Sequence, residues 1–387
     1  MKAKTLIIIA LFLSAAPFSG NAIYLNVNIF YKQGIKKIEF SVFSGRYSVS
    51  VDGKKVQAAV KGEKCEFIAK GDSVEYLKNG KKIGTYSQIK ILGTSFINVF
   101  TIKPLSPDLK SRNYDDHLFI ESNKGQLNLL NNVDLEHYVA GVVQSESGGS
   151  NDNIEYFFVQ AIISRTYALV NYLKHKDEGF NLCDGVHCQY YLGRCRNSDI
   201  ARAVARTSGD VIVDKDNRMI SAAFHSNCGG QTVNSEDVWS IPTSYLKSVN
   251  DTFCMHESNA KWEKRMSKKE WLAFLEKQYH YPVNDTSMAN KAIHFNQKRR
   301  KINFYGDIPL KFIRQDLGLR STFFSIEPLG EDSILISGRG YGHGVGLCQQ
   351  GAINMVKTGF DYKEVIKHYY TGVKIIHYSE LKYNFMP

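Results

Sequence analysis

Hydrophobic and polar residues in the first third of the chain alternate with the period of two that is typical of β-strands. Residues 47–51 show this alternation and lead into Asp52-Gly53, a pair that favours a two-residue hairpin turn because both positions tolerate positive φ. No catalytic constellation accompanies the pattern. We therefore predict a β-rich N-terminal region over residues 23–115.

A stretch rich in Pro, Ser and Asp at residues 104–116 interrupts the alternation and indicates a domain boundary. Alternating apolar residues resume on both sides of Asn123-Lys124-Gly125, which predicts one more hairpin. Beyond this hairpin the period lengthens to that of a helix. We therefore expect a second domain over residues 116–387 that combines helices with antiparallel strands, so that the chain has an α+β fold.

The segment after the hairpin carries the apolar stripe of an amphipathic helix, with Asp134 in the N-cap position. The stripe recurs at i, i+3, i+4, i+7 and i+8 through Leu135, Tyr138, Val139, Val142 and Val143. Glu146 occupies the next position of the stripe, and Gly148-Gly149 predicts the end of the helix. The stripe is thus interrupted by one carboxylate.

A second amphipathic helix is predicted over residues 154–172, with Ser150 or Asn151 as its N-cap. Its stripe consists of Ile154, Phe157, Phe158, Ala161, Ile162, Ala168, Leu169 and Tyr172. The residue that interrupts this stripe is Arg165.

A charged residue on a core-facing stripe is costly to bury, so it is either paired or placed where its chemistry is used. One interpretation is a buried ion pair between Glu146 and Arg165 that ties the two helices together. The other places Glu146 in a cleft, where burial and the negative end of its helix raise the pKa of the carboxyl group, as suits a general acid. A nearby guanidinium lowers that pKa, and the sequence leaves both interpretations open.

The last third of the chain joins a charged segment to a glycine-rich one. Residues 255–325 are charged and helical in pattern, and Ser267 and Glu270 form a capping box before an apolar run. We interpret this segment as a basic helical insertion. Further on, glycine occupies every second position from Gly338 to Gly346, which lets a backbone or a ligand approach closely.

The composition is that of a folded protein with a basic surface. The 387 residues are 43% hydrophobic and 22% charged, and their formal net charge is +11. Such a charge suits an anionic partner such as a nucleic acid, a membrane surface or a cell-wall polymer. The one block of basic residues, 298–301, is short for a nucleic-acid-binding arm, and we expect no nucleic-acid partner.

The N-terminus has the pattern of a secretory signal. Lys2 and Lys4 precede an apolar run, and small residues follow at Gly20-Asn21-Ala22. We predict a signal peptide over residues 1–22, with a retained anchor as the alternative, although the run is short for a spanning helix. No second stretch of the sequence is apolar enough to cross a membrane. The mature protein is therefore expected to be secreted or periplasmic.

These patterns resemble the stage II sporulation protein D family, which also includes the amidase-enhancer proteins. The matching features, in the family's order, are Leu135-Glu-His-Tyr-Val-Ala-Gly-Val-Val with Glu146, Gln160-Ala with Arg165-Thr-Tyr-Ala168, His187-Cys188-Gln189-x-Tyr191, Ser226 with Gly229-Gly230, and Gly342-His-Gly-Val-Gly346 with Gln349-x-Gly-Ala352. They span roughly residues 118–375. The β-rich region and the basic insertion lie outside them.

The resemblance implies a lytic transglycosylase that cleaves peptidoglycan glycan strands in a glycan-binding cleft, with Glu146 at the catalytic position. One carboxyl group suffices for this reaction, because it acts first as general acid and then as general base while the sugar closes a 1,6-anhydro ring. Ordinary glycoside hydrolysis requires two carboxylates. Some relatives are described only as activators of wall enzymes, so the alternative is a glycan-binding protein that stimulates a cell-wall amidase.

The sequence departs from the family pattern beside the expected catalytic residue. The family usually has Pro-Ser-Glu-Met-Pro where this chain has Gln144-Ser-Glu-Ser-Gly148, and Cys348 replaces a common Ser or Thr. Glu146 stays aligned through both changes. The shape of the loop and the preferred substrate are the properties that these changes affect.

The resemblance also implies a structural zinc site, because some family members hold zinc at the position of Cys183, His187 and Cys188. His175 completes a set of four ligands. The competing interpretation is a disulfide from Cys183 or Cys188 to Cys195, which is natural outside the cytoplasm. A zinc hydrolase would require ligands that leave one position open, so we expect zinc, if bound, to be structural and unnecessary for the chemistry.

Two further sets of residues complete these expectations, and the cysteines among them are chosen from their number and their position on both sides of Trp239. Arg165, Ser226, Tyr341, His343 and Gln349 are the expected substrate contacts. The chain has seven cysteines, so at least one is unpaired or bound to metal, and Cys228 and Cys254 are candidates for a second disulfide.

Overall fold

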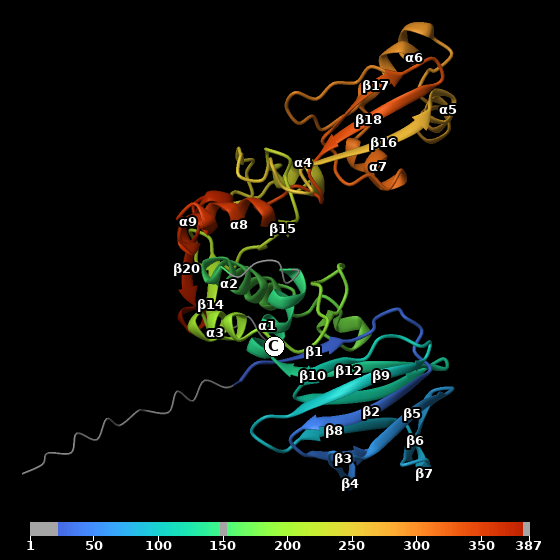
Figure 1. The fold of residues 1–387 in the computed structure, drawn as a ribbon, viewed down its shortest axis with the longest axis vertical. Helices are drawn as coiled ribbons and strands as arrows, with labels where there is room; N and C mark the ends of the chain where they lie inside the picture. Colours follow the sequence, from blue (N-terminus) through green and yellow to red (C-terminus); the bar gives the residue numbers. More distant parts are fainter. Residues whose placement is uncertain (1–21, 148–152, 382–387) are drawn as a thin grey trace, which may run out of the picture.

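The computed structural model describes residues 22–147 and 153–381, and it has an α+β fold. Figure 1 shows a β-rich N-terminal unit, a central group of helices and a small lobe of strands and helices at the far end. Residues 1–21, which make up nearly all of the predicted signal peptide, lie outside the described residues. Within the described ranges, none of the helices has the length and apolar character that crossing a bilayer requires.

The N-terminal unit consists of two sheets. The seven-stranded sheet has the order β13-β1-β12-β11-β8-β3-β4, and the six-stranded sheet has the order β10-β9-β2-β5-β6-β7. The first is built from β1 (Tyr24–Asn28), β3 (Tyr47–Val51), β4 (Lys54–Ala59), β8 (Gln88–Gly93), β11 (His117–Asn123), β12 (Gln126–Asp134) and β13 (Leu182–Cys183). The second is built from β2 (Lys37–Ser44), β5 (Lys64–Lys70), β6 (Ser73–Lys78), β7 (Lys81–Tyr86), β9 (Val99–Ser106) and β10 (Arg112–Asp115).

The alternation in the sequence explains this unit. In β2 every second residue is buried, and in β3 both ends and the centre are buried, because successive side chains point to opposite faces of a strand. The predicted hairpin at Asp52-Gly53 is confirmed: it joins β3 to β4, and both residues have positive φ. The sheets continue past residue 115, since β11 pairs with both β8 and β12.

The central part combines helices with short strand pairs. Its helices are α1 (Leu135–Glu146), α2 (Ile154–Val170), α3 (Ser198–Arg206), α4 (Ser235–Trp239), α8 (Gln349–Lys357) and α9 (Tyr362–Tyr369). Strand β14 (Asp210–Val213) pairs with β20 (Lys374–His377), and β15 (Phe224–His225) runs parallel to β19 (Leu347–Cys348). Short 3-10 turns lie at Lys176–Glu178, Tyr305–Asp307 and Tyr378–Glu380.

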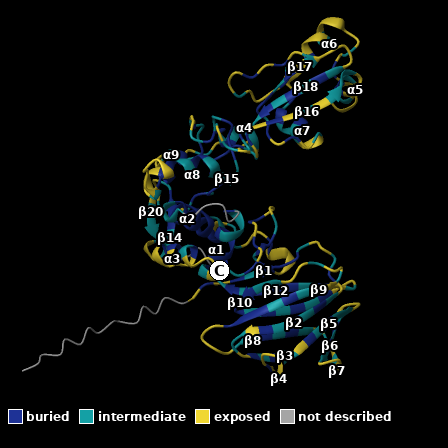
Figure 2. Cartoon of the chain, viewed as in Figure 1, coloured by how far each residue is buried: buried dark blue, intermediate teal, exposed yellow. Residues whose placement is uncertain are grey.

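Both predicted amphipathic helices are confirmed. Every residue of the predicted α1 stripe is buried, and Asp134 caps the helix by accepting the backbone N–H of Glu136. Helix α2 is buried along nearly its whole length, as Figure 2 shows, and its N-cap is Asn153. The predicted cap at Ser150 or Asn151 and the predicted Gly148-Gly149 stop lie outside the described residues.

The small lobe has a hydrophobic core of its own around Trp271. Its three-stranded sheet has the order β16-β18-β17, and its parts are β16 (Lys261–Ser267), α5 (Lys268–Tyr279), α6 (Thr286–Ala292), α7 (Leu310–Asp316), β17 (Phe324–Leu329) and β18 (Ser333–Arg339). The predicted capping box is confirmed, since Ser267 and Glu270 cap α5 reciprocally. The predicted helical insertion thus has strands at both of its borders, where tertiary pairing prevails over the charged local pattern.

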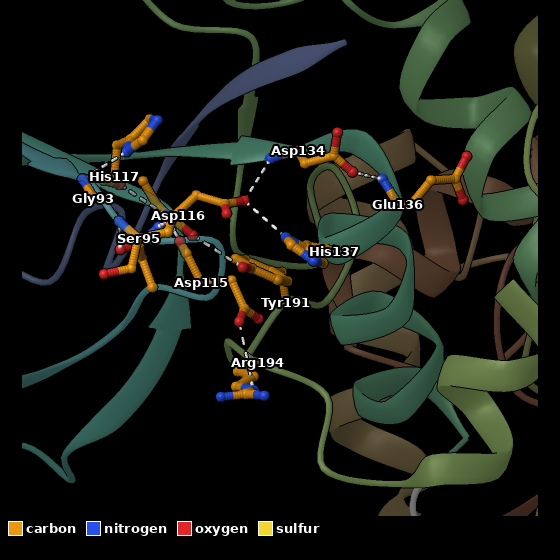
Figure 3. Close-up of polar contacts among 12 residues, drawn as sticks. Gly93, Ser95, Asp115, Asp116, His117, Asp134, Glu136, His137, Tyr191 and Arg194 are labelled. Atoms are coloured by element: carbon orange, nitrogen blue, oxygen red, sulfur yellow. Dashed lines mark hydrogen bonds and ion pairs between the residues drawn. The ribbon is translucent and has the colours of Figure 1, made fainter. Parts of the chain in front are cut away.

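The joint between the N-terminal unit and α1 is polar (Figure 3). Asp116 Oδ2 accepts the Asp134 backbone N–H at 2.8 Å and lies 2.9 Å from Nδ1 of His137 in the first turn of α1. The hydrogen bond to Asp116 raises the pKa of His137 to about 9. Asp116, which lies between β10 and β11, therefore connects the sheets to the first turn of the helix that ends at Glu146.

We expect the pKa of His137 to fall by more than one unit in Asp116→Asn, because the amide removes the carboxylate charge that favours imidazolium. Asn also tolerates the positive φ of 69° at this position. Since folding raises this pKa, the pair's contribution to stability is complete below the unfolded value of about 6.5 and is lost as the pH rises through about 9. An NMR titration of the imidazole measures the shift, and an unchanged pKa in the variant would contradict the pairing.

Candidate functional site

Glu146 is the last residue of α1, and its half-buried carboxylate is held by two donors. Oε1 accepts the backbone N–H of Tyr190 at 3.0 Å, and Oε2 lies 3.5 Å from the side-chain amide Nε2 of Gln349. Neither donor is charged. Among the described residues, no Lys, Arg or His forms an ion pair with Glu146.

The loop that supplies the Tyr190 donor is fastened to the last turn of α1. The Leu192 backbone N–H donates to Ser145 Oγ at 3.0 Å, and the Arg196 and Asn197 backbone N–H groups donate to Gln144 Oε1 at 2.6 and 3.1 Å. Gln144 and Ser145, the two residues directly before Glu146, therefore fix the position of the loop. The Tyr190 ring, in contrast, is exposed.

A chain of hydrogen bonds leads from Glu146 to the glycine-rich segment. Gln349 begins α8, and its neighbour Gln350 accepts the side-chain amide of Asn227 at 2.7 Å. The backbone of Asn227 exchanges two hydrogen bonds with that of Tyr341, at 2.7 and 3.1 Å. The structure thus brings Gln349 to the acid and Tyr341 into the same hydrogen-bonded framework.

Burial determines the acidity of Glu146. Desolvation raises the pKa of its carboxyl group, while the hydrogen bonds from Tyr190 and Gln349 lower it by a smaller amount. The net effect is a pKa above the usual range for Glu. A carboxyl group in this state keeps its proton to a higher pH, which is the property that a general acid needs.

The interpretation in which Glu146 forms an ion pair with Arg165 is wrong. Arg165 is completely buried and forms a bidentate pair with Glu136, with Nε–Oε1 at 2.9 Å and Nη2–Oε2 at 2.5 Å. Its Nη1 donates to the Asp210 backbone carbonyl at 3.0 Å. The guanidinium fixes the start of α1 to α2 and β14, at the opposite end of α1 from Glu146, and so does not lie beside Glu146.

Ser226 and His343 occupy different surroundings. Ser226 Oγ accepts the side-chain amide of Asn259 at 2.9 Å, and its backbone carbonyl accepts the Gln350 N–H at 3.0 Å, so it joins the framework around α8. The His343 ring instead lies 5.3 Å from the exposed Trp239 ring, and its Nδ1 accepts the Val345 backbone N–H at 3.0 Å. Desolvation, helped by Arg314, lowers the pKa of His343 to about 4 and keeps the ring neutral.

The glycine-rich segment packs closely against its neighbours. Gly346 has a φ of 70°, and a Cβ at that position would lie 2.2 Å from the Ala223 carbonyl oxygen. At Gly342, with a φ of 119°, a Cβ would lie 2.7 Å from Cβ of His225. Both glycines are therefore required by a backbone conformation and a contact that a larger residue cannot share.

The four predicted metal ligands come together beside this site. The ligand atoms of His175, Cys183, His187 and Cys188 all lie within 4.8 Å of one another. Cys188 Sγ lies 3.3 Å from His175 Nε2, and His187 Nδ1 lies 3.9 Å from both sulfurs. Tetrahedral zinc places such donor atoms about 3.3–3.8 Å apart. The set can hold a metal ion.

The surroundings of His175 support this use. Its Nδ1 lies 2.6 Å from Glu178 Oε1, so that Nε2 faces the cluster, and a carboxylate on the far nitrogen is typical of ligating histidines. The predicted disulfide to Cys195 is not formed, because Cys195 Sγ instead contacts the Asn197 carbonyl at 3.4 Å. The predicted disulfide between Cys228 and Cys254 is not formed either. Both are free and grouped with Asp251 and Cys348.

Sequence reasoning missed three residues of the site: Tyr190, Asn227 and Gln350. Tyr190 acts through its backbone N–H, which side-chain chemistry does not reveal, and its position in Gln189-x-Tyr191 had seemed free to vary. Asn227 and Gln350 lie next to motif residues, and adjacency is the one signal that could have drawn attention to them.

The sequence is similar to several known proteins. Residues 123–213 match the family model described as stage II sporulation protein. An uncharacterized protein of Brachyspira hyodysenteriae is 31% identical over 283 residues, which cover 71% of this chain and 75% of that protein. Stage II sporulation protein D of Bacillus amyloliquefaciens is 30% identical over 275 residues, covering 64% of this chain and 75% of that protein.

A third relative carries a different name. The amidase enhancer of Bacillus subtilis is 25% identical over 294 residues, which cover 62% of this chain and 40% of that protein. The matched region in each case is longer than the segment that the family model recognises. On this similarity, the chain belongs to the stage II sporulation protein D family, which includes the amidase enhancers.

Proposed function

We propose that the protein is a lytic transglycosylase that cleaves peptidoglycan glycan strands with Glu146 as its general acid and base. The observation that supports this most is the state of Glu146: a half-buried carboxyl group with a raised pKa, held by two neutral donors and free of a charged partner among the described residues. Membership of the family and the amidase-enhancer relative support a role in the cell wall.

The reaction proceeds in two proton transfers at one carboxyl group. Glu146 first donates its proton to the glycosidic oxygen while the bond from that oxygen to the sugar's C1 breaks. The carboxylate then takes the proton of the 6-hydroxyl group as O6 bonds to C1 and closes the 1,6-anhydro ring. Water is not consumed and Glu146 ends in its starting state, so a single acid suffices.

The residues around Glu146 have separate tasks in this proposal. The Tyr190 N–H and the Gln349 amide orient the carboxylate and stabilise its anionic form after the first transfer. Ser226, Tyr341 and His343 are proposed substrate contacts, and the exposed Tyr190 ring adds an aromatic surface for a sugar. Arg165 is no longer among the proposed contacts, because it is buried against Glu136.

The cysteine–histidine cluster is proposed to hold a structural zinc ion through His175, Cys183, His187 and Cys188. Four protein ligands leave no open position, so the ion has no part in the chemistry. Its place matters because Cys188 is two residues from Tyr190, whose N–H binds Glu146. The ligands thereby hold the loop that orients the acid.

We expect Cys183→Ser to lose one zinc ion per chain, as measured by elemental analysis of protein purified under reducing conditions. Cys195→Ser is the matched control, because Cys195 lies outside the cluster, and it should keep the full content. Equal zinc in wild type and Cys183→Ser would contradict the assignment. Peptide mapping that finds a disulfide between Cys195 and either Cys183 or Cys188 would also contradict the assignment.

Incubation of the purified protein with glycan strands, with and without their stem peptides, tests the proposed function. Mass spectrometry should find fragments with anhydro ends. The protein is expected to meet this polymer outside the cytoplasm. Its formal net charge is +11 for the whole chain and 11 − 2 = +9 without Lys2 and Lys4 of the predicted signal peptide, and both values suit an anionic wall. Absence of cleavage on both substrates would reject the enzyme.

The pH dependence tests the role of Glu146 separately. Since the acid must be protonated and its pKa is raised, the rate should stay high above the ordinary pKa of Glu and fall as the pH rises through the elevated value. In Glu146→Asp the pH at which the rate falls should shift, because the shorter side chain draws the carboxyl group away from the Tyr190 N–H. A rate that stays constant from about pH 4 to about pH 8 would be incompatible with this carboxyl group as the general acid.

A second function is favoured by one comparison. The amidase-enhancer relative suggests a protein that binds glycan and stimulates a cell-wall amidase. An amidase assay with and without this protein distinguishes the two functions. Stimulation that persists in Glu146→Gln, with no anhydro products from wild type, would favour the activator.

A further inference from the structure

Three cysteines and one aspartate meet in the core where the small lobe joins the central part. Cys228 follows β15, Asp251 and Cys254 precede β16, and Cys348 ends β19. All four side chains are buried, and one ligand atom of each lies within 4.8 Å of the others. This three-cysteine cluster shares no residue with the cysteine–histidine cluster.

The distances within the three-cysteine cluster suit a tetrahedral ion. Cys228 Sγ lies 3.4 Å from Cys254 Sγ and 3.3 Å from Asp251 Oδ2. Zinc bound by sulfur at about 2.3 Å and by oxygen at about 2.0–2.2 Å places these atoms about 3.5–3.8 Å apart. A shift of a few tenths of an ångström would bring all four atoms onto one ion.

Asp251 points to a bound cation independently of the cysteines. Its side chain is completely buried, and Oδ2 accepts the Tyr369 hydroxyl at 2.9 Å. Within the described residues, no Lys, Arg or His forms an ion pair with it. A buried carboxylate without a compensating charge is costly, and a divalent ion on Oδ2 would supply that charge.

The surrounding backbone is arranged to support thiolates. Cys348 Sγ accepts the N–H groups of Cys228 and Gly351, at 3.3 and 3.4 Å. A Cβ at Gly351 would lie 2.2 Å from Asp251 Oδ2, so only glycine lets the first turn of α8 approach the aspartate this closely. N–H donors to sulfur of this kind orient and stabilise metal-bound cysteines.

We infer that Cys228, Asp251, Cys254 and Cys348 bind a second structural zinc ion. Thiolates select a soft or borderline metal such as zinc over calcium or magnesium, and four protein ligands form a closed site. The ion joins the chain before the small lobe, at Asp251 and Cys254, to the chain after it, at Cys348. It also fixes the N-terminus of α8, whose first residue, Gln349, contacts Glu146.

Elemental analysis of the full chain, purified under reducing conditions with zinc present, tests the inference. Wild type should contain two zinc ions, Cys348→Ser one, and Cys183→Ser one, because each substitution removes a ligand of a different site. Cys65→Ser is the matched control: Cys65 is buried in the N-terminal unit outside both clusters, and the variant should keep two. Equal zinc in Cys348→Ser and wild type would overturn the inference.

Cobalt provides a second readout that does not depend on counting. In the Cys183→Ser background, Co²⁺ should produce a strong thiolate-to-cobalt absorption that Cys254→Ser abolishes. If Cys348→Ser fails to fold, the zinc content of the Cys183→Ser single variant still decides the question. One ion per chain supports the second site, and a variant without zinc overturns the inference. A disulfide between Cys228 and Cys254, found by peptide mapping of unreduced protein, would also overturn it. These measurements require no substrate, so their outcome is separate from that of the proposed reaction.

Discussion

Replacement of Glu146 by Gln is expected to lower the rate of glycan cleavage by at least about 10³-fold, within the range by which general acid–base catalysis contributes. The amide has the shape of the carboxyl group but can neither donate a proton to the glycosidic oxygen nor take one from the 6-hydroxyl group. Both proton transfers depend on this residue in the proposed reaction, so the loss falls on the rate of bond cleavage and not on glycan binding. A cleavage assay with a separate binding measurement resolves the two.

Glu276→Gln is the matched control for this substitution. Glu276 is exposed on α5 in the small lobe, and its replacement by Gln removes the same charge far from Glu146. We expect it to retain the wild-type rate. Cleavage by Glu146→Gln within a few-fold of wild type would mean that another group supplies the proton.

Replacement of Arg165 by Ala is expected to lower the free energy of unfolding by about 3 kcal/mol, the lower end of the range for breaking a buried pair. The lower end applies because Glu136, left without its partner, keeps 26% of its side chain exposed. The Asp210 carbonyl also loses a donor. Denaturation in urea measures the effect, with the exposed Arg299→Ala as control and a change within about 0.5 kcal/mol expected for it.

Stability also separates the two interpretations of Glu146 that the sequence allowed. If Glu146 were the partner of Arg165, Glu146→Gln would destabilise the protein about as much as Arg165→Ala. The structure predicts the opposite sign, because burial raises the pKa of Glu146 and the ionised form is disfavoured in the folded state. This cost in folding free energy is absent below the pKa that Glu146 has in the unfolded chain, and it grows as the pH rises through the pKa of Glu146 in the folded protein. At neutral pH the Gln variant should therefore be no less stable than wild type.

The sequence predicted the elements that local pattern controls. The stripe of α1 is buried in full, the turn at Asp52-Gly53 forms, and Ser267 caps α5, because spacing, turn chemistry and capping act within a few residues. Glu146 became the candidate acid for the same reason, because it interrupts a regular stripe. The four Cys and His side chains predicted to bind metal do come together, and three of them lie within six residues.

What the sequence could not predict depends on contacts between distant segments. Glu136 lies off the α1 stripe, so periodicity gave no reason to choose it over Glu146 as the partner of Arg165. Cys228 and Cys348 are 120 residues apart, with the small lobe between them. The partner of Gln349 lies 203 residues away. No spacing rule reaches across such separations, and packing of the whole chain decides them.

The break in alternation at residues 104–116 does not mark the end of the sheets, for a related reason. The Pro-rich stretch after residue 104 marked a break in alternation, but in the structure it connects β9 to β10 within one sheet. Strands pair with partners that need not be near in sequence, so a loop inside a sheet and a linker between domains have the same composition.

Cleavage in water enriched in heavy oxygen tests the central claim most directly, because it asks which atom attacks C1. If Glu146 closes the 1,6-anhydro ring, wild-type products will carry anhydro ends without the heavy label, and Glu146→Gln will give none of them. Products whose new ends carry the label would show that water attacks, and the protein would then be a hydrolase that needs a second catalytic carboxylate.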